Sequence, residues 1–447
     1  MQRVFALAGL LGLCGALAAP AVAADLRSAL SAAEVRDPTL AAARANRDAA
    51  AEYVPLARSR LLPQVSLQAS AQRLHQTTTE ETLLGERETK FVGPSGSAQL
   101  ALRQGLYRPR DRVGLEVGEL QAEVGTYQLA SASSELWRRA STAWLDVLLA
   151  ESQHEAMGEA MAAAERTQAQ ARRRLSDGDG TRDAVAEAEA QFAAARARVN
   201  EAALLRDARQ RQFAALTGLA GVALDSWRLP QQLPAPLARS EGEFIELLLA
   251  RNTELRAATA TFAVSEKRLA QARADHLPSL DLVASASRSQ NDTAANVGSS
   301  YRYQQIGVQF ALPLFTGGGL SAAERQAAAF SMAAASDRDA FAQTLRLRAS
   351  ELWASEQGLR ERIGGAAGLV EAAREQLYAA EQGLRHGVRS IGDVSAAATL
   401  LANRRRDHAE LRYTLLSTQA QLLAGLPTDD PAWAGWIGGL ESVARLR

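Results

Sequence analysis

The chain contains one stretch twice, and this duplication limits what it can fold into. Eight residues between Leu40 and Leu67 recur at a constant separation of 215 residues (255 − 40 = 282 − 67 = 215). They are Leu40, Ala42, Ala43, Ala57, Arg58, Leu62, Pro63 and Leu67, which recur as Leu255, Ala257, Ala258, Ala272, Arg273, Leu277, Pro278 and Leu282. Both copies begin as an Ala-rich helical pattern that stops at a Leu-Pro step, because proline disfavours helical geometry in the preceding residue and has no amide proton. The duplication predicts two halves of one architecture, each with a helix-to-strand switch.

Each Leu-Pro step is followed by alternating apolar and polar residues, the pattern of a β-strand with two unlike faces. We predict strand pairs at about 63–107 and about 278–315, separated by polar segments at 75–96 and 290–300. Two strands of about ten residues in each half would be long enough to cross a bilayer at a tilt. A half-buried strand of a soluble sheet has the same pattern. Aromatic residues lie near the predicted strand ends, where membrane barrels carry aromatic girdles, but ordinary packing at strand ends would place them there too. They are Phe91, Tyr107, Tyr301, Tyr303 and Phe315.

After each strand pair comes a long span without proline, at 110–229 and 314–426. Each span has one break near its middle, at Gly178 and Gly387. The helix before each break would have about 65 residues and a length of ~100 Å, so it needs partners along its length. We therefore predict two long helical hairpins with tips near these glycines. Their second helices are expected to end at left-handed glycine caps, Gly218 and Gly425.

The N-terminus has the pattern of an export signal. Arg3 precedes an apolar run at 4–19, and the small-residue site Ala21-Val22-Ala23 follows. We expect a secretory signal peptide that is cleaved there. The predicted organisation is a signal peptide at 1–24, a first repeat at 25–229, a second repeat at 230–426 and a C-terminal tail at 427–447 without a counterpart in the first half.

The composition and motifs argue against several classes of function. The 50 basic and 50 acidic residues balance, whereas a general nucleic-acid binder needs an excess of positive charge. Cys14, the single cysteine, lies within the expected signal peptide, so no disulfide or thiolate metal site is expected. The glycines at 317–319 lack the lysine of a phosphate-binding loop, and the five histidines have no metal-ligand spacing. We expect no cofactor, no metal and no catalytic site.

Three motifs carry a resemblance to a known family. They are Leu-Phe-Thr-Gly-Gly at 314–318, Gly-Val-Arg-Ser-Ile-Gly-Asp-Val at 387–394 and Leu-Leu-Ala-Asn at 400–403. Together with the duplication, they resemble the TolC family of Gram-negative outer-membrane channels over essentially the whole mature chain. The resemblance implies an α+β membrane protein in which three subunits each give four transmembrane strands to a twelve-stranded barrel. The hairpins would form an α-helical barrel that extends into the periplasm.

The resemblance also implies partners and functional residues. A periplasmic adaptor and an inner-membrane pump would dock at the hairpin tips, where the expected residues are Gly178, Gly387 and Val388. Asp393 matches an aspartate ring that narrows the pore entrance in this family, and Arg389 matches a residue that holds it closed. The family's usual partner position for Arg389 is Ala184 here, so a contact with the adjacent Asp183 is a hypothesis. The alternating patterns predict the lipid-facing strand residues Val65, Leu67, Leu280, Leu282, Ile306, Val308 and Phe310.

The expected function is a passive exit duct in the outer membrane, for drugs and other small molecules or for unfolded polypeptides. The alternatives are a periplasmic coiled-coil adaptor or scaffold of an export complex, and an exported enzyme that only the chain length supports. An adaptor usually has one long hairpin flanked by β-rich domains, whereas this hairpin is duplicated. The sequence leaves the cargo, the adaptor and the pump open.

Overall fold

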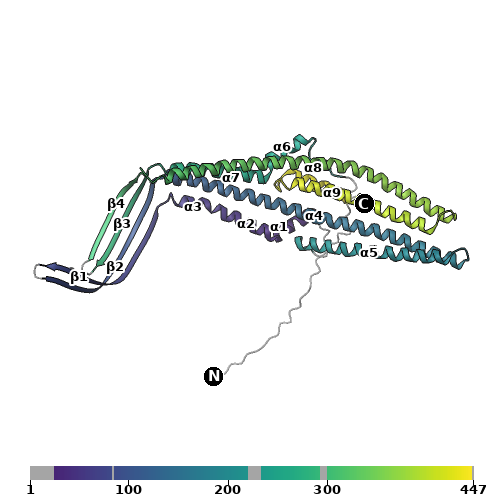
Figure 1. The fold of residues 1–447 in the computed structure, drawn as a ribbon, viewed down its shortest axis with the longest axis horizontal. Helices are drawn as coiled ribbons and strands as arrows, with labels where there is room; N and C mark the ends of the chain where they lie inside the picture. The colour runs from purple at the N-terminus through teal and green to yellow at the C-terminus, as the bar shows by residue number, and fades with distance from the viewer. Residues whose placement is uncertain (1–24, 83–84, 220–232, 292–299, 445–447) are drawn as a thin grey trace, which may run out of the picture.

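The computed structural model describes residues 25–82, 85–219, 233–291 and 300–444, so the predicted signal peptide lies outside the described residues. The described strands form one four-stranded sheet. It lies at one end of an elongated molecule, and long helices run away from it (Figure 1). The elements of the first half are α1 (Leu26–Arg36), α2 (Pro38–Ala51), α3 (Tyr53–Ser59), β1 (Gln64–Thr82), β2 (Gly85–Tyr107), α4 (Pro109–Ser176) and α5 (Arg182–Thr217). Those of the second half are α6 (Glu241–Arg251), α7 (Thr253–Ala274), β3 (Ser279–Asn291), β4 (Ser300–Ala311), α8 (Gly319–Arg385), α9 (Ile391–Leu423) and α10 (Pro431–Ala444).

The duplication extends to the helix caps. The Asp37 side chain accepts a hydrogen bond of 2.9 Å from the Leu40 amide at the start of α2. The Asn252 side chain accepts one of 2.8 Å from the Leu255 amide at the start of α7. The two caps are 215 residues apart, like the eight repeated residues (252 − 37 = 215). β1 and β3 begin directly after Pro63 and Pro278, so the predicted helix-to-strand switches are confirmed.

The sheet is antiparallel throughout, in the order β1-β2-β3-β4. The prediction of ten-residue strands is wrong for the first half, where β1 has 19 residues and β2 has 23. The segment 75–96 is not a loop, because pairing continues from His75 with Val92 to Thr82 with Gly85. β-Branched threonines at 77–79 favour this continuation. β4 ends at Ala311 rather than near 315, because Pro313 has no amide proton for a ladder.

The register places the apolar strand residues on one face. Val65 lies opposite Leu102, Leu102 opposite Ala284, and Ala284 opposite Ile306. Residues separated by an even number of positions along a strand share a face. Tyr303 lies opposite Ser287 on the other face, so it does not belong to an aromatic girdle on the apolar one.

The two long helices have the predicted length: α4 has 68 residues and α8 has 67. They pack against α5 and α9 in two hairpins, and α4 also lies along α7 and α9. The core is midway along the helices, where Trp144 and Leu148 of α4 and Leu416 of α9 are buried. The tail after 427 contributes α10, whose Trp433 and Trp436 are buried in the same core. No helix in the described part of the chain combines the length and apolar content needed to span a bilayer.

One predicted cap is confirmed and the other is wrong. Gly218 ends α5 in the left-handed conformation with φ of 78°. α9 instead ends at Ala424 in right-handed geometry, and Gly425 has no positive φ. Gly425 is needed for a close approach, since a Cβ atom there would lie 2.6 Å from the Asn252 side chain. Its carbonyl also accepts a hydrogen bond of 3.1 Å from the Thr253 amide.

Candidate functional site

The sheet has an exposed apolar face and two edges. Within the described residues, β1 and β4 each pair with a strand on one side only. The predicted lipid-facing residues of these two strands are exposed: Val65 by 65%, Leu67 by 72%, Ile306 by 77%, Val308 by 60% and Phe310 by 63%. Leu280 and Leu282 lie in the middle of the sheet and are half-buried.

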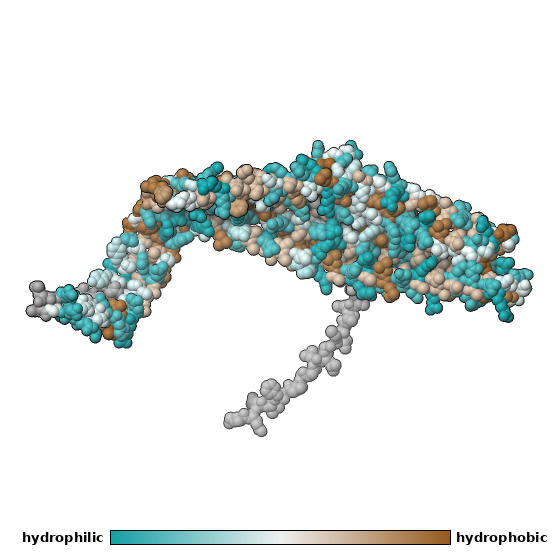
Figure 2. Space-filling model, viewed as in Figure 1, coloured by the Kyte–Doolittle hydropathy of each residue, from teal (hydrophilic) through white to brown (hydrophobic). Residues whose placement is uncertain are grey.

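Hydrophobic residues also gather at the bend between the sheet and the helices, which is brown in Figure 2. Leu314 and Phe315 are both 88% exposed there. The apolar surface therefore continues from the strands to the point where the helices begin. A contiguous exposed apolar surface marks a site that contacts another protein or a membrane.

The polar face of the sheet carries a charge cluster around one buried carboxylate, close to the helices. Asp281 of β3 is 3% exposed and accepts hydrogen bonds from two arginines. Arg103 of β2 donates from Nε at 3.0 Å and from Nη2 at 2.5 Å. Arg108, the N-cap residue of α4, donates from Nε at 2.6 Å and from Nη2 at 2.8 Å. Arg108 also pairs with Asp111 at 3.1 Å, and the hydrogen bonds to Asp281 and Asp111 raise the pKa of its guanidinium.

The sequence did not single out this cluster. One sequence feature pointed to it: Asp281 is a charged residue in an alternating strand, and the equivalent position in the first repeat is Ser66 (281 − 66 = 215). The partners of Asp281 are more than 170 residues away in the chain, so only the fold brings them together.

At the opposite end of the molecule, the two hairpin tips have the same geometry. Gly178 and Gly387 adopt φ of 85° and 73°. The amide of the residue after each glycine, Asp179 or Val388, donates to the carbonyl five residues earlier at 2.9 Å. Val388 is 77% exposed. The structure therefore places Gly178, Gly387 and Val388 on two matched turns at one end of the molecule.

Asp393 lies just beyond the second tip and caps α9. Its carboxylate accepts from the Ser390 amide at 2.8 Å and from the Ser390 hydroxyl at 3.0 Å. The Asp393 amide donates to the Ser390 hydroxyl at 3.1 Å, which completes a capping box. The hydrogen bonds from Ser390, with a smaller effect of the Arg389 charge, hold the pKa of Asp393 below its usual range. The carboxylate is therefore ionised at neutral pH.

The structure shows no contact between Arg389 and Asp183 within the described chain. Arg389 instead lies 3.9 Å from Asp393. Asp183 is exposed in the first turn of α5, on the other hairpin. A contact of Arg389 with Asp183 on a neighbouring hairpin stays a prediction.

The two hairpins pack against each other close to the tips. Ala171 and Ala188 of the first hairpin are buried with Leu384, Ile391 and Val394 of the second. The Glu187 side chain of α5 also lies against Gly392 of α9, since a Cβ atom on Gly392 would lie 2.6 Å from a carboxylate oxygen of Glu187. The hairpins are therefore held together by apolar contacts just behind their tips.

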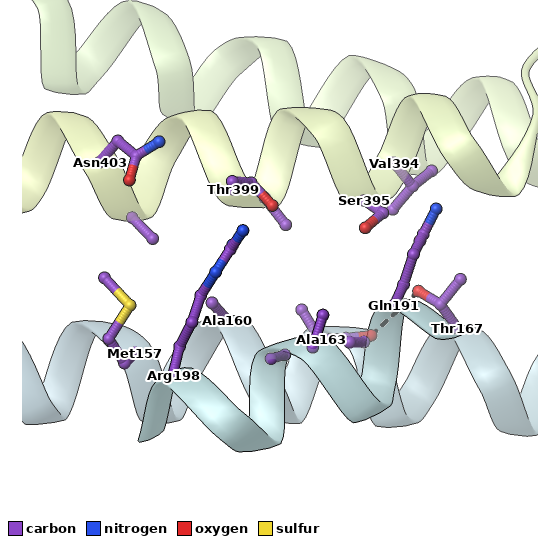
Figure 3. Close-up of a pocket in the computed structure, with 15 residues that line it drawn as sticks. Met157, Ala160, Ala163, Thr167, Gln191, Arg198, Val394, Ser395, Thr399 and Asn403 are labelled. Atoms are coloured by element: carbon purple, nitrogen blue, oxygen red, sulfur yellow. Dashed lines mark hydrogen bonds between the residues drawn. The ribbon is translucent and has the colours of Figure 1, made fainter. Parts of the chain in front are cut away.

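A cavity of about 120 Å³ lies between α4, α5 and α9, farther from the tips (Figure 3). Small side chains such as Ala160 and Ala163 line it from α4. Further small apolar residues line it from α5 and α9, together with polar groups such as Gln191 and Arg198 of α5 and Asn403 of α9. In the described part of the chain, no group of three or more His, Cys, Asp or Glu side chains is arranged to hold a metal ion.

Comparison with known proteins gives consistent results. Residues 29–222 and 244–426 match the sequence profile described as outer membrane efflux protein. The chain is 28% identical to the outer membrane protein TolC of Vibrio cholerae over 93% of both chains. It is also 28% identical to the alkaline protease secretion protein AprF of Pseudomonas aeruginosa, over 86% of this chain and 81% of that protein.

The fold matches solved outer-membrane proteins. The outer membrane protein VceC of Vibrio cholerae aligns with a TM-score of 0.74 and 20% identity, over 90% of this chain and 96% of that one. The Campylobacter jejuni CmeC outer membrane channel aligns with a TM-score of 0.73 and 16% identity, over 94% of this chain and 89% of that one.

Proposed function

The chain belongs to the outer membrane efflux protein family, and we propose that three copies of it form the exit duct of a tripartite export system. It is a channel protein and not an enzyme. The observation that carries the trimer is the four-stranded sheet, which has an apolar face and an unpaired edge on each side within the described residues.

The edges explain why copies must associate. In hydrocarbon no water can satisfy the unpaired amides and carbonyls of β1 and β4, so an open sheet is not viable there. Four strands are too few to close around a pore, because eight strands leave an interior just wide enough for side chains. β1 and β4 run in opposite directions, so β4 of one copy can pair with β1 of the next in the same antiparallel pattern. Three copies would give twelve strands.

In this proposal the apolar face meets lipid and the polar face lines the duct. The helices continue the duct into the periplasm over ~100 Å, since each long helix rises about 1.5 Å per residue. The aspartates at position 393 of three copies would form a ring of carboxylates near the pore axis, which attracts cations and hinders anions.

We propose that a periplasmic adaptor, joined to an inner-membrane pump, docks on the surface formed by Gly178, Gly387 and Val388. The exposed Val388 offers an apolar contact. Small residues such as Ala160 and Ala163 line the cavity between α4, α5 and α9, and they would allow a further helix to approach closely there. The proposed cargo is small molecules or unfolded polypeptides that the pump delivers.

Cell fractionation tests the proposal. We expect the protein in outer membranes as a trimer that migrates differently on gels before and after heating, and that forms ion-conducting channels in planar bilayers. A monomer in the soluble periplasmic fraction, with no conductance, would show that the sheet is not a membrane element and would favour the adaptor or scaffold.

A further inference from the structure

Two arginines face each other on the strands of the second repeat. Arg288 of β3 lies directly opposite Arg302 of β4 in the antiparallel register. Both are exposed, and neither forms an ion pair with any residue that the structure describes. Like charges directly opposite one another destabilise a sheet. An anion that contacts both guanidinium groups would remove this repulsion.

The pair lies on the apolar face. Arg302 is an even number of residues from Ile306 and Phe310, and Arg288 is an even number from Leu282, so all share one face. The row continues across the sheet through Ala98 of β2 and Ala69 of β1, which are opposite Arg288 and Ala98 respectively. The small alanines leave the surface beside the arginines open.

The pair also marks a depth. Arg302 lies eight positions before Phe310, which is near the helices (310 − 302 = 8). At about 3.3 Å per residue this is ~26 Å along the strand, and a strand tilt of about 40° leaves ~20 Å along the membrane normal. Apolar bands of membrane barrels are about 25 Å tall. The arginines therefore lie at the far border of the apolar band, where lipid headgroups of the outer leaflet would be.

We propose that Arg288 and Arg302 bind a phosphate monoester on the headgroup of an outer-leaflet glycolipid. The inference rests on the proposed function, because it requires this face to meet lipid. Guanidinium groups match phosphate oxygens with two parallel hydrogen bonds each. A monoester carries about −1.5 to −2 charges at neutral pH, enough to face two arginines, whereas a phosphodiester carries one. The position at the border of the band removes most of the cost of a charged residue on a lipid-facing surface.

The test compares two double variants of the full-length trimer purified in detergent. Arg288→Gln/Arg302→Gln removes the pair without altering strand length or register. Arg325→Gln/Arg346→Gln removes two exposed arginines of α8 and serves as the matched control. The probe is a fluorescent diphosphorylated glycolipid, with the same lipid after phosphatase treatment and phosphatidylglycerol as competitors. Heat-modified mobility of each variant checks that the trimer is intact.

We expect the first variant to bind the phosphorylated glycolipid at least ~10-fold more weakly than the control variant, because charge-assisted hydrogen bonds are lost. The dephosphorylated lipid and phosphatidylglycerol should compete poorly. Equal affinity of the two variants would overturn the proposal, and so would equally strong competition by phosphatidylglycerol. An intact outer-membrane trimer with unchanged lipid binding refutes this inference alone. A protein that forms no such trimer refutes the proposed function as well.

Discussion

Asp281 and Arg108 are joined by two hydrogen bonds of 2.6 and 2.8 Å, which connect a strand of the second repeat to the N-cap residue of the long helix of the first repeat. Arg103 shares the same carboxylate from the neighbouring strand. The sheet and the helices meet at a bend, and the ion pairs of Asp281 with Arg103 and Arg108 connect them there.

We expect Asp281→Asn to lower the free energy of unfolding by about 1–3 kcal/mol, because hydrogen bonds to a charged group are lost and the half-buried Arg108 keeps its charge with fewer partners. The expected loss of free energy is smaller than for breaking a fully buried ion pair, because the Arg103 side chain is 56% exposed. Thermal unfolding of the purified trimer measures the effect. Asp275→Asn, which removes a more exposed pair with Arg110, is the control and should cost less. If both variants lower the free energy of unfolding equally, Asp281 contributes no more to stability than the less buried Asp275.

The two faces of β4 should respond oppositely to a new charge. We expect Ile306→Lys to cost about 2–4 kcal/mol if it lies near the middle of the bilayer, whereas Gln305→Lys on the other face should be tolerated. Gln305 and Ile306 are neighbours in β4 and point to opposite faces of the sheet, so the two variants differ only in the face that receives the charge. The amount of heat-modifiable trimer in outer membranes is the measurement. Equal assembly of both variants would contradict the assignment of the apolar face to lipid.

Local chemistry made parts of this fold predictable. Pro63 and Pro278 determine where the helices stop, and their effect does not depend on distant residues. The spacing of Gly178 and Gly387 within proline-free spans likewise predicted the tips.

The parts that were missed depend on contacts between distant residues. The outer half of β1 and β2 is a strand because each supports the other, and its polar sequence resembles a loop. Gly425 is required by its contact with Asn252 rather than by a helix cap, and the partners of Asp281 come from elements far away in the chain. The hypothesised contact between Arg389 and Asp183 is not formed in the described chain, where Arg389 lies beside Asp393 instead.

The tip glycines should resist substitution. We expect Gly178→Ala and Gly387→Ala each to cost about 1–2 kcal/mol, because both residues have positive φ and a side chain there clashes with the backbone. Gly358→Ala is the control, since this glycine lies inside α8 and a Cβ atom added to it would meet no neighbour within 4 Å. Alanine there should stabilise the helix by about 0.5–1 kcal/mol. The rate of limited proteolysis at the tips is the measurement, and it should rise in the two tip variants. Unchanged proteolysis in both tip variants would contradict the expectation.

The proposed latch at the entrance predicts a change in conductance. If Arg389 and Asp183 of neighbouring hairpins hold the entrance closed, Arg389→Ala and Asp183→Ala should each increase the closed-state current in planar bilayers. Arg385→Ala is the control, because Arg385 is exposed near the same tip and is not part of the proposed contact. If both variants keep the closed-state current of the unmodified channel, the latch does not exist.

His408 should make the stability of the helical part depend on pH. Burial, together with the charge of Arg412, lowers the pKa of His408 from its ordinary value of 6.5. The folded protein then binds a proton at His408 less readily than the unfolded chain does, so the contribution to stability is full above pH 6.5 and is lost as the pH falls below it. We expect His408→Gln to flatten the fall of the unfolding midpoint between about pH 7.5 and pH 5. His386→Gln, which changes an exposed histidine at the second tip, should keep the slope of the unmodified protein. The same slope in both variants would show that another group carries the pH dependence.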